Sequence, residues 1–496
     1  MKVIEPGAIN PRRADRPLVL AIDIGSSSVR AAVHDRLGRT LTGTAVQVPY
    51  AWEMASDVSV RLSHRTLLDL VGQTLDQVVD VSGSLPLQVV AGGISCFFHS
   101  ISGLDVAGRP VTPVLSWADT TSAGEAAALR GRIDPDWAHA VSGVPIHASY
   151  WPARVLRLRQ EQPRIRHWAG FPELLMEALT GRAAVSRSMA SGTGLLDRAQ
   201  GTWSSELLEQ VDIELGDLPP IVADDEPLGR LSAASAQRWP QLAHLSWFAP
   251  WGDGSCGNVG LAATAPGRAA LMVGTSGALR AFIADPAPPI TPGLFAYRLG
   301  AGTVAGGQLS EGGGLLAWAS RLLGRSRRSL ERAAAAVAAD GHGLTVLPYA
   351  FGERGLGYHD RARGVLAGLH ADSDQAAVYR AILESIAFGF AAIDDRLSDL
   401  LGQAPTVIAS GGALARSRLL AQVIADSLGR EIAVAPMFEA SRHGAALLAL
   451  RGSGALDDVT AVPRPRARTV RPDPERVARY VAARARQRAL YETVLG

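Results

Sequence analysis

Short apolar runs alternate with segments of helical periodicity along the first half of the chain. Residues 19–24, 29–33 and 89–94 are short and mainly apolar, and they predict buried strands. Residues 123–132 and 153–160 have the composition and length of helices. Strands that alternate with helices are typical of a mixed α/β fold.

The second half repeats this pattern and adds one longer helix. Apolar side chains recur at helical spacing from Val378 to Leu400, which predicts a long buried helix. A predicted strand at residues 407–410 runs into Gly411-Gly412, and an amphipathic helix is expected to follow.

Proline and glycine positions indicate how the chain divides. Residues 218–250 are rich in proline and loop residues, and a glycine-rich stretch then begins a second set of strands. We therefore place a boundary near residue 249. The expected units are a flexible leader at 1–16, an N-terminal lobe at 17–248, a C-terminal lobe at 249–452, and a tail with a helix at 453–496.

The arginine-rich tail after Pro463 has two interpretations. Its charge would suit an anion-binding arm. We favour an amphipathic terminal helix packed on the body, because apolar and long side chains recur at suitable positions: Val477, Tyr480, Val481, Arg484 and Tyr491.

Composition narrows the class of protein. A chain of 496 residues, 47% hydrophobic and 19% charged, predicts a globular protein with two large domains and a cleft between them. The formal net charge is only +2, which argues against a nucleic-acid partner.

Two cysteines cannot form a disulfide framework and offer no metal-ligand spacing, so a reducing cytoplasm fits best. We see no signal-peptide core and no stretch approaching an uncharged membrane span, and expect no membrane partner.

The first motif with chemical meaning is AIDIGSSSVRAAV, residues 21–33. It predicts a strand, a glycine turn with three hydroxyls and a second strand, a hairpin whose N–H groups can surround phosphate oxygens. Asp23 precedes the turn and would serve best by holding Mg2+ beside a nucleotide, since a bare carboxylate repels phosphate. An aspartate before glycine can also be a simple turn former.

The same hairpin pattern occurs a second time at residues 271–283, LMVGTSGALRAFI. Aligning Gly25 with Gly274 places Ser26 on Thr275 and Ser27 on Ser276. Met272 stands where the first copy has its aspartate. Both copies could therefore grip phosphate, whereas only the first could organise a metal ion, and the pair implies duplicated domains facing each other across a nucleotide.

Two further glycine-rich segments complete the candidate site. Gly411 and Gly412 lie between a predicted strand and a helix, where a base or ribose could lie against bare backbone, although such a junction often serves only close packing. The segment WGDGSCGN puts Asp253 at the expected domain junction. Phosphoryl transfer to an alcohol needs a group that accepts the hydroxyl proton, and Asp253 suits that role better than the role of a loop residue.

The ordered motifs DIGSSSVR, GDGSCGNVG, GTSGA and SGGALARS resemble the FGGY carbohydrate kinases from about residue 18 to 452. The resemblance implies a two-lobe actin-like, ribonuclease H-like α/β fold, ATP with Mg2+, and transfer of the γ-phosphate to a sugar or polyol hydroxyl. It makes Asp23 the metal-side aspartate and Asp253 the catalytic base. The positions expected to line the nucleotide are Ser26, Ser27, Arg30, Thr275, Gly313, Gly411, Gly412 and Arg416.

Within that family, several segments are most similar to the gluconate kinases, above all GDGSCGNVG. The implied substrate-side residues are His99, Trp117, Asp119 and His147, beside Asp253. Departures from the family pattern include Thr121, Arg154, Arg157 and the segment Glu353-Arg354-Gly355-Leu356. A gluconate carboxylate needs a cationic or N–H-rich partner, for which Arg154 or His147 is the expected candidate.

The resemblance favours phosphorylation of D-gluconate to 6-phosphogluconate by a cytoplasmic enzyme. The nearest alternative is a kinase of the same family for xylulose, glycerol or a related polyol. A non-kinase actin-like ATPase and a binding-only protein belong to different classes, and the sequence leaves a homodimer open.

Overall fold

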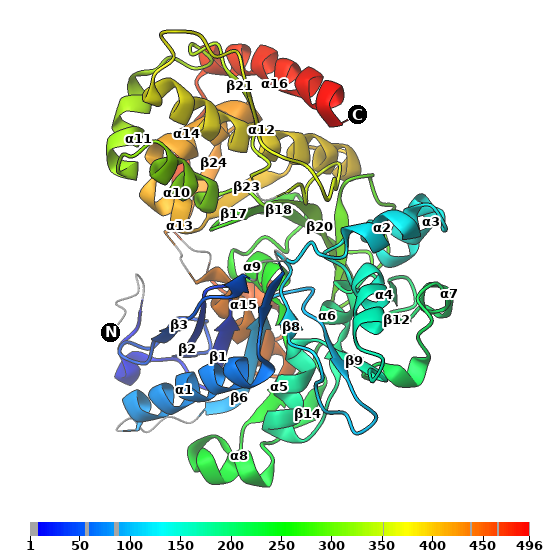
Figure 1. Ribbon diagram of the computed structural model, residues 1–496. Coiled ribbons are helices and arrows are strands. Elements are labelled where there is room, and N and C mark those ends of the chain that lie inside the picture. The colour runs from blue at the N-terminus through cyan, green and yellow to red at the C-terminus, as the bar shows by residue number, and fades with distance from the viewer. Residues whose placement is uncertain are drawn as a thin grey trace.

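The computed structural model of the chain describes residues 8–54, 59–83, 89–350, 352–436, 439–463 and 466–495. Figure 1 shows two lobes, each built around a β-sheet with flanking helices. Two helices, α9 (Asp253–Gly260) and α15 (Ala440–Gly452), lie between the sheets and pack closely on each other. The expected α/β fold in two lobes is confirmed.

The N-terminal lobe has a mixed sheet in the order β14-β15-β6-β1-β2-β3, with β16 beside β6. Strand β1 pairs antiparallel with β2 and parallel with β6. Side chains alternate along β1, so that Leu20 and Ile22 pack with α1, whereas Val19 and Ala21 pack with α15. The same alternation turns Asp23 towards the α15 side. The strands are β1 (Leu18–Ile24), β2 (Ser28–His34), β3 (Val46–Pro49), β6 (Val89–Cys96), β14 (Pro227–Gly229), β15 (Ser246–Phe248) and β16 (Trp251–Gly252).

The C-terminal lobe repeats this arrangement in the order β19-β20-β18-β17-β23-β24-β25. Strand β17 pairs antiparallel with β18 and parallel with β23, as β1 does with β2 and β6. The duplication expected from the two hairpins is therefore present in the sheet topology. The strands are β17 (Arg268–Val273), β18 (Gly277–Ile283), β19 (Phe295–Leu299), β20 (Gly302–Leu309), β23 (Thr406–Ser410), β24 (Ile432–Val434) and β25 (Arg468–Val470).

Helix ends follow local sequence signals. In α12, the Asp374 side chain accepts a hydrogen bond from the Ala377 N–H, and Gly402 ends the helix at φ 67°. Ser417 and Gly429 bound α14 in the same way. The remaining helices are α1 (His64–Ser82), α2 (Ala123–Arg130), α3 (Pro135–Ser142), α4 (Trp151–Glu161), α5 (Phe171–Thr180), α6 (Arg187–Ser191), α7 (Ser205–Glu209), α8 (Ala233–Arg238), α10 (Gly313–Leu322), α11 (Arg327–Ala336), α12 (Gln375–Leu401), α13 (Gly412–Arg416), α14 (Arg418–Leu428) and α16 (Pro474–Leu495).

Small sheets decorate the main ones. In the N-terminal lobe, one of them brings the loop after β8 to the cleft side of the lobe, and in the C-terminal lobe β21 and β22 bracket residues 348–364. Their strands are β4 (Glu53–Met54), β5 (Val60–Leu62), β7 (Ser102–Leu104), β8 (Val114–Leu115), β9 (His167–Ala169), β10 (Val185–Ser186), β11 (Leu196–Asp197), β12 (Thr202–Trp203), β13 (Ile221–Val222), β21 (Thr345–Leu347) and β22 (Val365–Ala367).

The start of the chain, the boundary between the lobes and the C-terminal tail were each assigned from the sequence, and the structure differs from some of these assignments. Residues 1–7 of the expected leader lie outside the described residues, but Ile9 pairs with Leu41 and Asp15 is bonded by Arg39, so residues 9–15 pack on the lobe. The first sheet includes β16 and so extends past the boundary expected near residue 249. The tail adds β25 to the second sheet. Helix α16 packs on α14, as expected of a terminal helix on the body, and buries Tyr480 against α12, although Val481 is 64% exposed.

Helix α12 is long and apolar enough to cross a membrane by length and composition alone. It is not the uncharged stretch that the sequence was searched for, because it contains Arg380 and Glu384. Within the lobe, however, 78% of its apolar window is buried, and it packs against α11 and α14. These contacts are those of a core helix.

Candidate active site

A cleft of about 450 Å³ lies between the lobes, large enough for a nucleotide or a sugar. Both glycine hairpins, the start of α9 and the start of α15 reach it. Of the residues expected from the sequence, these line the cleft: Asp23, Ser26, Ser27, Arg30, His99, Trp117, Asp253, Thr275, Gly411, Gly412 and Arg416. Their roles remain predictions.

The first hairpin holds Asp23 in a fixed orientation at the edge of the cleft. Ser95 on β6 donates a hydrogen bond of 2.8 Å to Asp23 Oδ1, and Arg30 on β2 approaches Oδ2 at 3.3 Å. Arg30 also lies 3.4 Å from Glu439, just before α15. Asp23 is only 4% exposed, so its carboxylate is presented from a preformed socket.

The second hairpin is tighter than the first. Val273 pairs with Gly277 across a turn of three residues, whereas Ile24 pairs with Val29 across four. The N–H groups of Gly313 and Gly314 donate to the carbonyls of the turn, at Gly274 and Thr275. A Cβ on Gly313 would lie 2.7 Å from the Gly274 oxygen. Gly313 therefore supports the turn through its backbone, and its expected contact with a nucleotide stays a prediction.

The junction after β23 approaches the second hairpin closely. Gly411 has φ 113°, a left-handed conformation that favours glycine, and a Cβ there would lie 2.4 Å from the Val273 oxygen. Gly412 begins α13, with the Arg416 guanidinium folded back over it. Glycine is therefore required at 411 by close packing on Val273, and the backbone of both glycines also lines the cleft.

Asp253 is the first residue of α9 and lies at the junction of the lobes. Its Oδ1 accepts a hydrogen bond of 2.7 Å from the Gly254 N–H. Burial raises the pKa of Asp253 to about 6, against the opposing effect of Arg280 and with support from the Asp23 charge. A carboxylate with this pKa is ionised at neutral pH and can still accept a proton, as a general base must.

The glycines around Asp253 exist for packing. A Cβ on Gly257 would lie 2.5 Å from the Met272 sulfur, and one on Gly260 would lie 2.0 Å from the Ala440 oxygen on α15. Glycine at these positions lets α9 approach the second sheet and α15 together. The helix that begins at Asp253 is therefore held close to β17 and to α15.

His99 and Trp117 also line the cleft. His99 has φ 68°, unusual for a residue other than glycine, and its Nδ1 lies 2.6 Å from the Gly192 oxygen, so Nδ1 carries the proton. Burial lowers the pKa of His99, leaving a neutral ring whose Nε2 faces Tyr297 at 3.4 Å. The ring and the Tyr297 hydroxyl form a polar pair on the lining of the cleft.

Asp119 and His147 do not reach the cleft, contrary to expectation. Asp119 is 0% exposed and accepts hydrogen bonds from Val60 and Thr121. His147 is buried behind the lining of the cleft, 3.1 Å from Asp360, and burial lowers its pKa to about 4. Both residues are occupied by contacts inside the protein.

Arg154 cannot serve as the expected partner of a substrate carboxylate. It is 0% exposed, and its guanidinium donates to the carbonyls of His99, Ala148, Ser116 and Asp119. These bonds hold together the loops that carry His99 and Trp117. Arg154 therefore supports the lining of the cleft from within.

Two arginines that sequence reasoning did not place in the site line the cleft, Arg280 on β18 and Arg354. Arg280 lies beside Asp253 and donates to the Met272 sulfur at 3.5 Å. The Arg354 guanidinium lies 4.5 Å over the Trp117 ring. The one sequence signal for Arg354 was its position in the segment that departs from the family pattern.

Profiles of one protein family match nearly the whole chain. The N-terminal domain of the FGGY family of carbohydrate kinases matches residues 18–260, and its C-terminal domain matches residues 269–453. Among curated relatives, the gluconokinase of Bacillus subtilis is 25% identical over 462 residues, 90% of this chain and 89% of that protein. The xylulose kinase of Lactococcus lactis is 24% identical over 496 residues, 93% and 94% of the two chains.

Solved structures show the same fold. The gluconate kinase from Lactobacillus acidophilus superimposes with a TM-score of 0.88 at 22% identity, covering 96% of this chain and 98% of that one. The ligand-bound xylulose kinase from the same organism gives the same TM-score, identity and coverage. The duplicated hairpins, the interlobe cleft and both domain profiles agree, and the chain belongs to the FGGY family of carbohydrate kinases, phosphotransferases with an alcohol group as acceptor.

Proposed function

We propose that this carbohydrate kinase is ATP-dependent and phosphorylates a sugar acid, D-gluconate, at its terminal hydroxyl to give 6-phosphogluconate. The observation that supports the proposal is that Asp253, both hairpins, Arg280 and Arg354 line one cleft. A cleft that presents arginines beside a general base suits an anionic polyol better than a neutral one.

Asp253 would accept the proton of the attacking hydroxyl. Its pKa of about 6 keeps it ionised at pH 7 and leaves it basic enough to take that proton as the oxygen attacks. Arg280 stabilises the ionised form of Asp253 before the reaction. His99 and Tyr297, whose hydroxyl lies 3.4 Å from His99 Nε2, line the same cleft and would orient the substrate.

The cleft has the donors that ATP with Mg2+ requires. Among the described residues, no partner is found for the backbone N–H groups of Ser26 and Thr275, which lie at the tips of the turns. Asp23 offers a held carboxylate oxygen, the ligand type that Mg2+ prefers. When bound, ATP would supply the transferable phosphoryl group and Mg2+ would neutralise its charge. Arg416 and the Gly411-Gly412 backbone would contact the nucleoside side.

The relatives of this chain support a carbohydrate kinase, but they do not single out one sugar as its substrate. Gluconokinases and xylulose kinases are related to this chain at nearly equal identity, so a ketose such as xylulose remains the second candidate. Arg280 and Arg354 on the cleft favour gluconate over xylulose, because xylulose has no negative charge for an arginine to bind. By the same relatives we propose a cytoplasmic enzyme.

A substrate panel tests this function. Purified protein with ATP and Mg2+ is incubated with D-gluconate, D-xylulose, glycerol or no sugar, and ADP release is followed by a coupled assay. We expect the fastest sugar-dependent release with gluconate. If gluconate gave no more ADP than the control without sugar while another polyol did, the proposed substrate would be wrong.

A further inference from the structure

A further cavity, of about 240 Å³, lies at the C-terminal ends of α9 and α15. None of the residues that line it belongs to the lining of the catalytic cleft. An apolar cavity left empty forfeits packing contacts that larger side chains could supply. It therefore offers space for a small molecule. Its lining is mainly apolar and includes Val259, Phe282, Leu299, Leu448 and Val459.

Two polar side chains on this lining have chemistry available for a ligand. The Thr264 hydroxyl oxygen is buried and has no hydrogen-bond partner among the described residues, which is costly unless a ligand supplies one. Arg451 is exposed, and its Nη1 lies 3.8 Å from the place of a Cβ on Gly300, in the β19–β20 turn. It forms no ion pair within the described part of the chain. The pKa of Asp458 is lowered first by hydrogen bonds from Thr460 and only last by the Arg451 charge, so this guanidinium can still pair with an anion.

We propose that this cavity binds a small carboxylic acid with an apolar body, and that its binding slows the kinase reaction. The apolar lining would take the body, Arg451 would pair with the carboxylate, and the Thr264 hydroxyl would gain a hydrogen bond. A polyol is unsuited to such a cavity, because its hydroxyls would lose their hydrogen bonds to water. The ligand is therefore an effector and not a second substrate. The site does not depend on which sugar the enzyme phosphorylates.

The elements that line this cavity also line the catalytic cleft at their other ends. Helix α9 places Asp253 on the cleft and Val259 on the cavity, and α15 does the same with Ser441 and Leu448. The two helices are joined at the cleft end, where Ser441 Oγ donates a hydrogen bond of 3.0 Å to the Asp253 carbonyl. Strands β18, β19 and β20 likewise have residues on both linings. A ligand in the cavity would therefore contact the elements that hold the candidate base.

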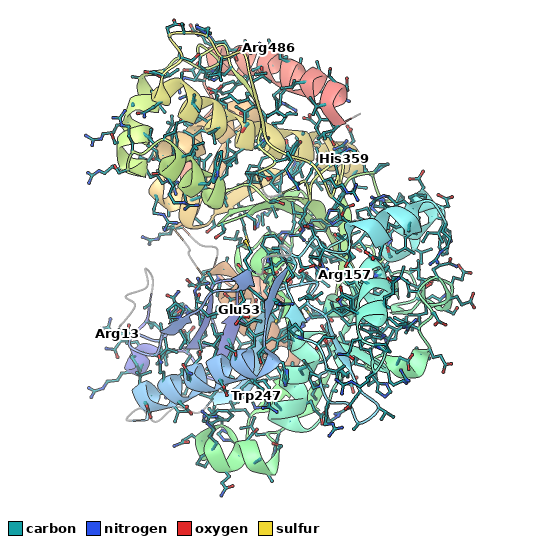
Figure 2. All side chains as sticks on the ribbon, viewed as in Figure 1. Arg13, Glu53, Arg157, Trp247, His359 and Arg486 are labelled. Carbon is teal, nitrogen blue, oxygen red and sulfur yellow. The ribbon has the colours of Figure 1, made fainter. Side chains whose placement is uncertain are left out.

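The cavity also lies between parts that belong to different lobes. At the end of α15, a Cβ on Gly452 would lie 2.5 Å from the Phe248 ring on β15, so this end is packed on the N-terminal sheet. In Figure 2 the labelled Trp247, the preceding residue of β15, lies in the lower part of the N-terminal lobe, away from the upper lobe. The strands on the cavity belong to the C-terminal sheet. A bound ligand would bridge the two and resist lobe movement, the kind of step that sets kcat in many enzymes.

The binding test uses sodium octanoate, which joins an apolar chain to a carboxylate. Calorimetric titration of the full chain, without ATP or sugar, compares octanoate with 1-octanol and with acetate. We expect one octanoate to bind per chain, octanol to bind roughly 3- to 10-fold more weakly, and acetate not to bind. Equal affinity for octanol would reveal an apolar void without a carboxylate site and would overturn the proposed ligand class.

Three variants locate the bound octanoate. R451Q removes the charge, so the Kd for octanoate should rise about 3- to 10-fold while that for octanol stays the same. Ala301→Trp places a large ring at an exposed turn residue of the lining and should weaken both ligands at least about 10-fold. R328Q is the matched control, since Arg328 is an exposed arginine of α11 in the same lobe and does not line the cavity. Octanoate binding that none of these changes alters would place the ligand elsewhere and overturn the proposal.

The rate test uses the sugar that the wild-type enzyme phosphorylates fastest. Saturating octanoate should lower kcat for sugar-dependent ADP release roughly two- to fivefold, with the KM for the sugar within about twofold. R451Q should need more octanoate for the same effect, and R328Q should not. Binding without a change in kcat, or inhibition that excess sugar relieves, would overturn the effector role. Failure of gluconate as a substrate would overturn the proposed function and leave this test intact.

Discussion

The raised pKa of Asp253 predicts how kcat/KM depends on pH. Burial raises its pKa from the ordinary value of 3.8 to about 6. A general base must be unprotonated, so activity is present above this pKa and lost as the pH falls through it. At pH 5 only about one tenth of the enzyme would carry an ionised Asp253, whereas a carboxyl with an ordinary pKa would be about nine tenths ionised. We therefore expect kcat/KM to fall about tenfold from pH 8 to pH 5.

Replacement of the carboxyl group tests the assignment. Asp253→Asn should lower kcat by roughly 100- to 10,000-fold and abolish the acidic limb of the profile. The matched control is Asp225→Asn, an exposed aspartate without a place on the cleft. Initial rates are measured by ADP release between pH 4.5 and 9, with melting curves showing that each protein stays folded. An Asp253→Asn protein with full sugar-dependent turnover, or an unchanged acidic limb, would refute the assignment.

The remaining predictions concern the metal, the hairpin junction and a buried acid. Asp23→Asn removes the held carboxylate, so half-maximal activity should require about 10- to 100-fold more Mg2+ in a titration; an unchanged requirement would exclude Asp23 as the metal-side ligand. Gly411→Ala adds a Cβ 2.4 Å from the Val273 oxygen at φ 113°, and should cost at least about 2 kcal/mol in urea unfolding and raise the KM for ATP. Burial raises the pKa of Glu173 from 4.5 to about 7, so between pH 4.5 and 7 the folded protein holds a proton on Glu173 that the unfolded chain has lost. The free energy of unfolding should therefore fall as the pH rises from 4.5 to 7, by up to about 3 kcal/mol. Glu173→Gln should flatten this pH dependence in thermal melts.

Local sequence signals were sufficient for the fold and for the phosphate side of the site. The β1–β2 and β17–β18 hairpins were predictable because glycine and hydroxyl residues between apolar runs dictate the turn within a few residues. Helix α12 was predictable because its buried face repeats over many turns. Such features depend on neighbours along the chain.

The substrate side of the cleft depends on contacts between distant segments, and the sequence was a poorer guide there. Asp119 and His147 have the chemistry of ligands, but their side chains are turned inward and satisfied by Thr121 and Asp360. Arg354 reaches the cleft only because α16 and the N-terminal lobe hold its segment from two sides. Neither outcome is encoded in local spacing.

Phosphorylation of a sugar acid at its terminal hydroxyl is the property on which the proposed function depends. It can be tested on the product of wild-type enzyme with ATP, Mg2+ and D-gluconate, identified by mass spectrometry and 31P NMR. We expect a gluconate monophosphate with the ester on the terminal primary carbon, absent from the Asp253→Asn reaction. Release of inorganic phosphate alone, or a phosphate ester formed only when a neutral sugar replaces gluconate, would contradict the proposed function.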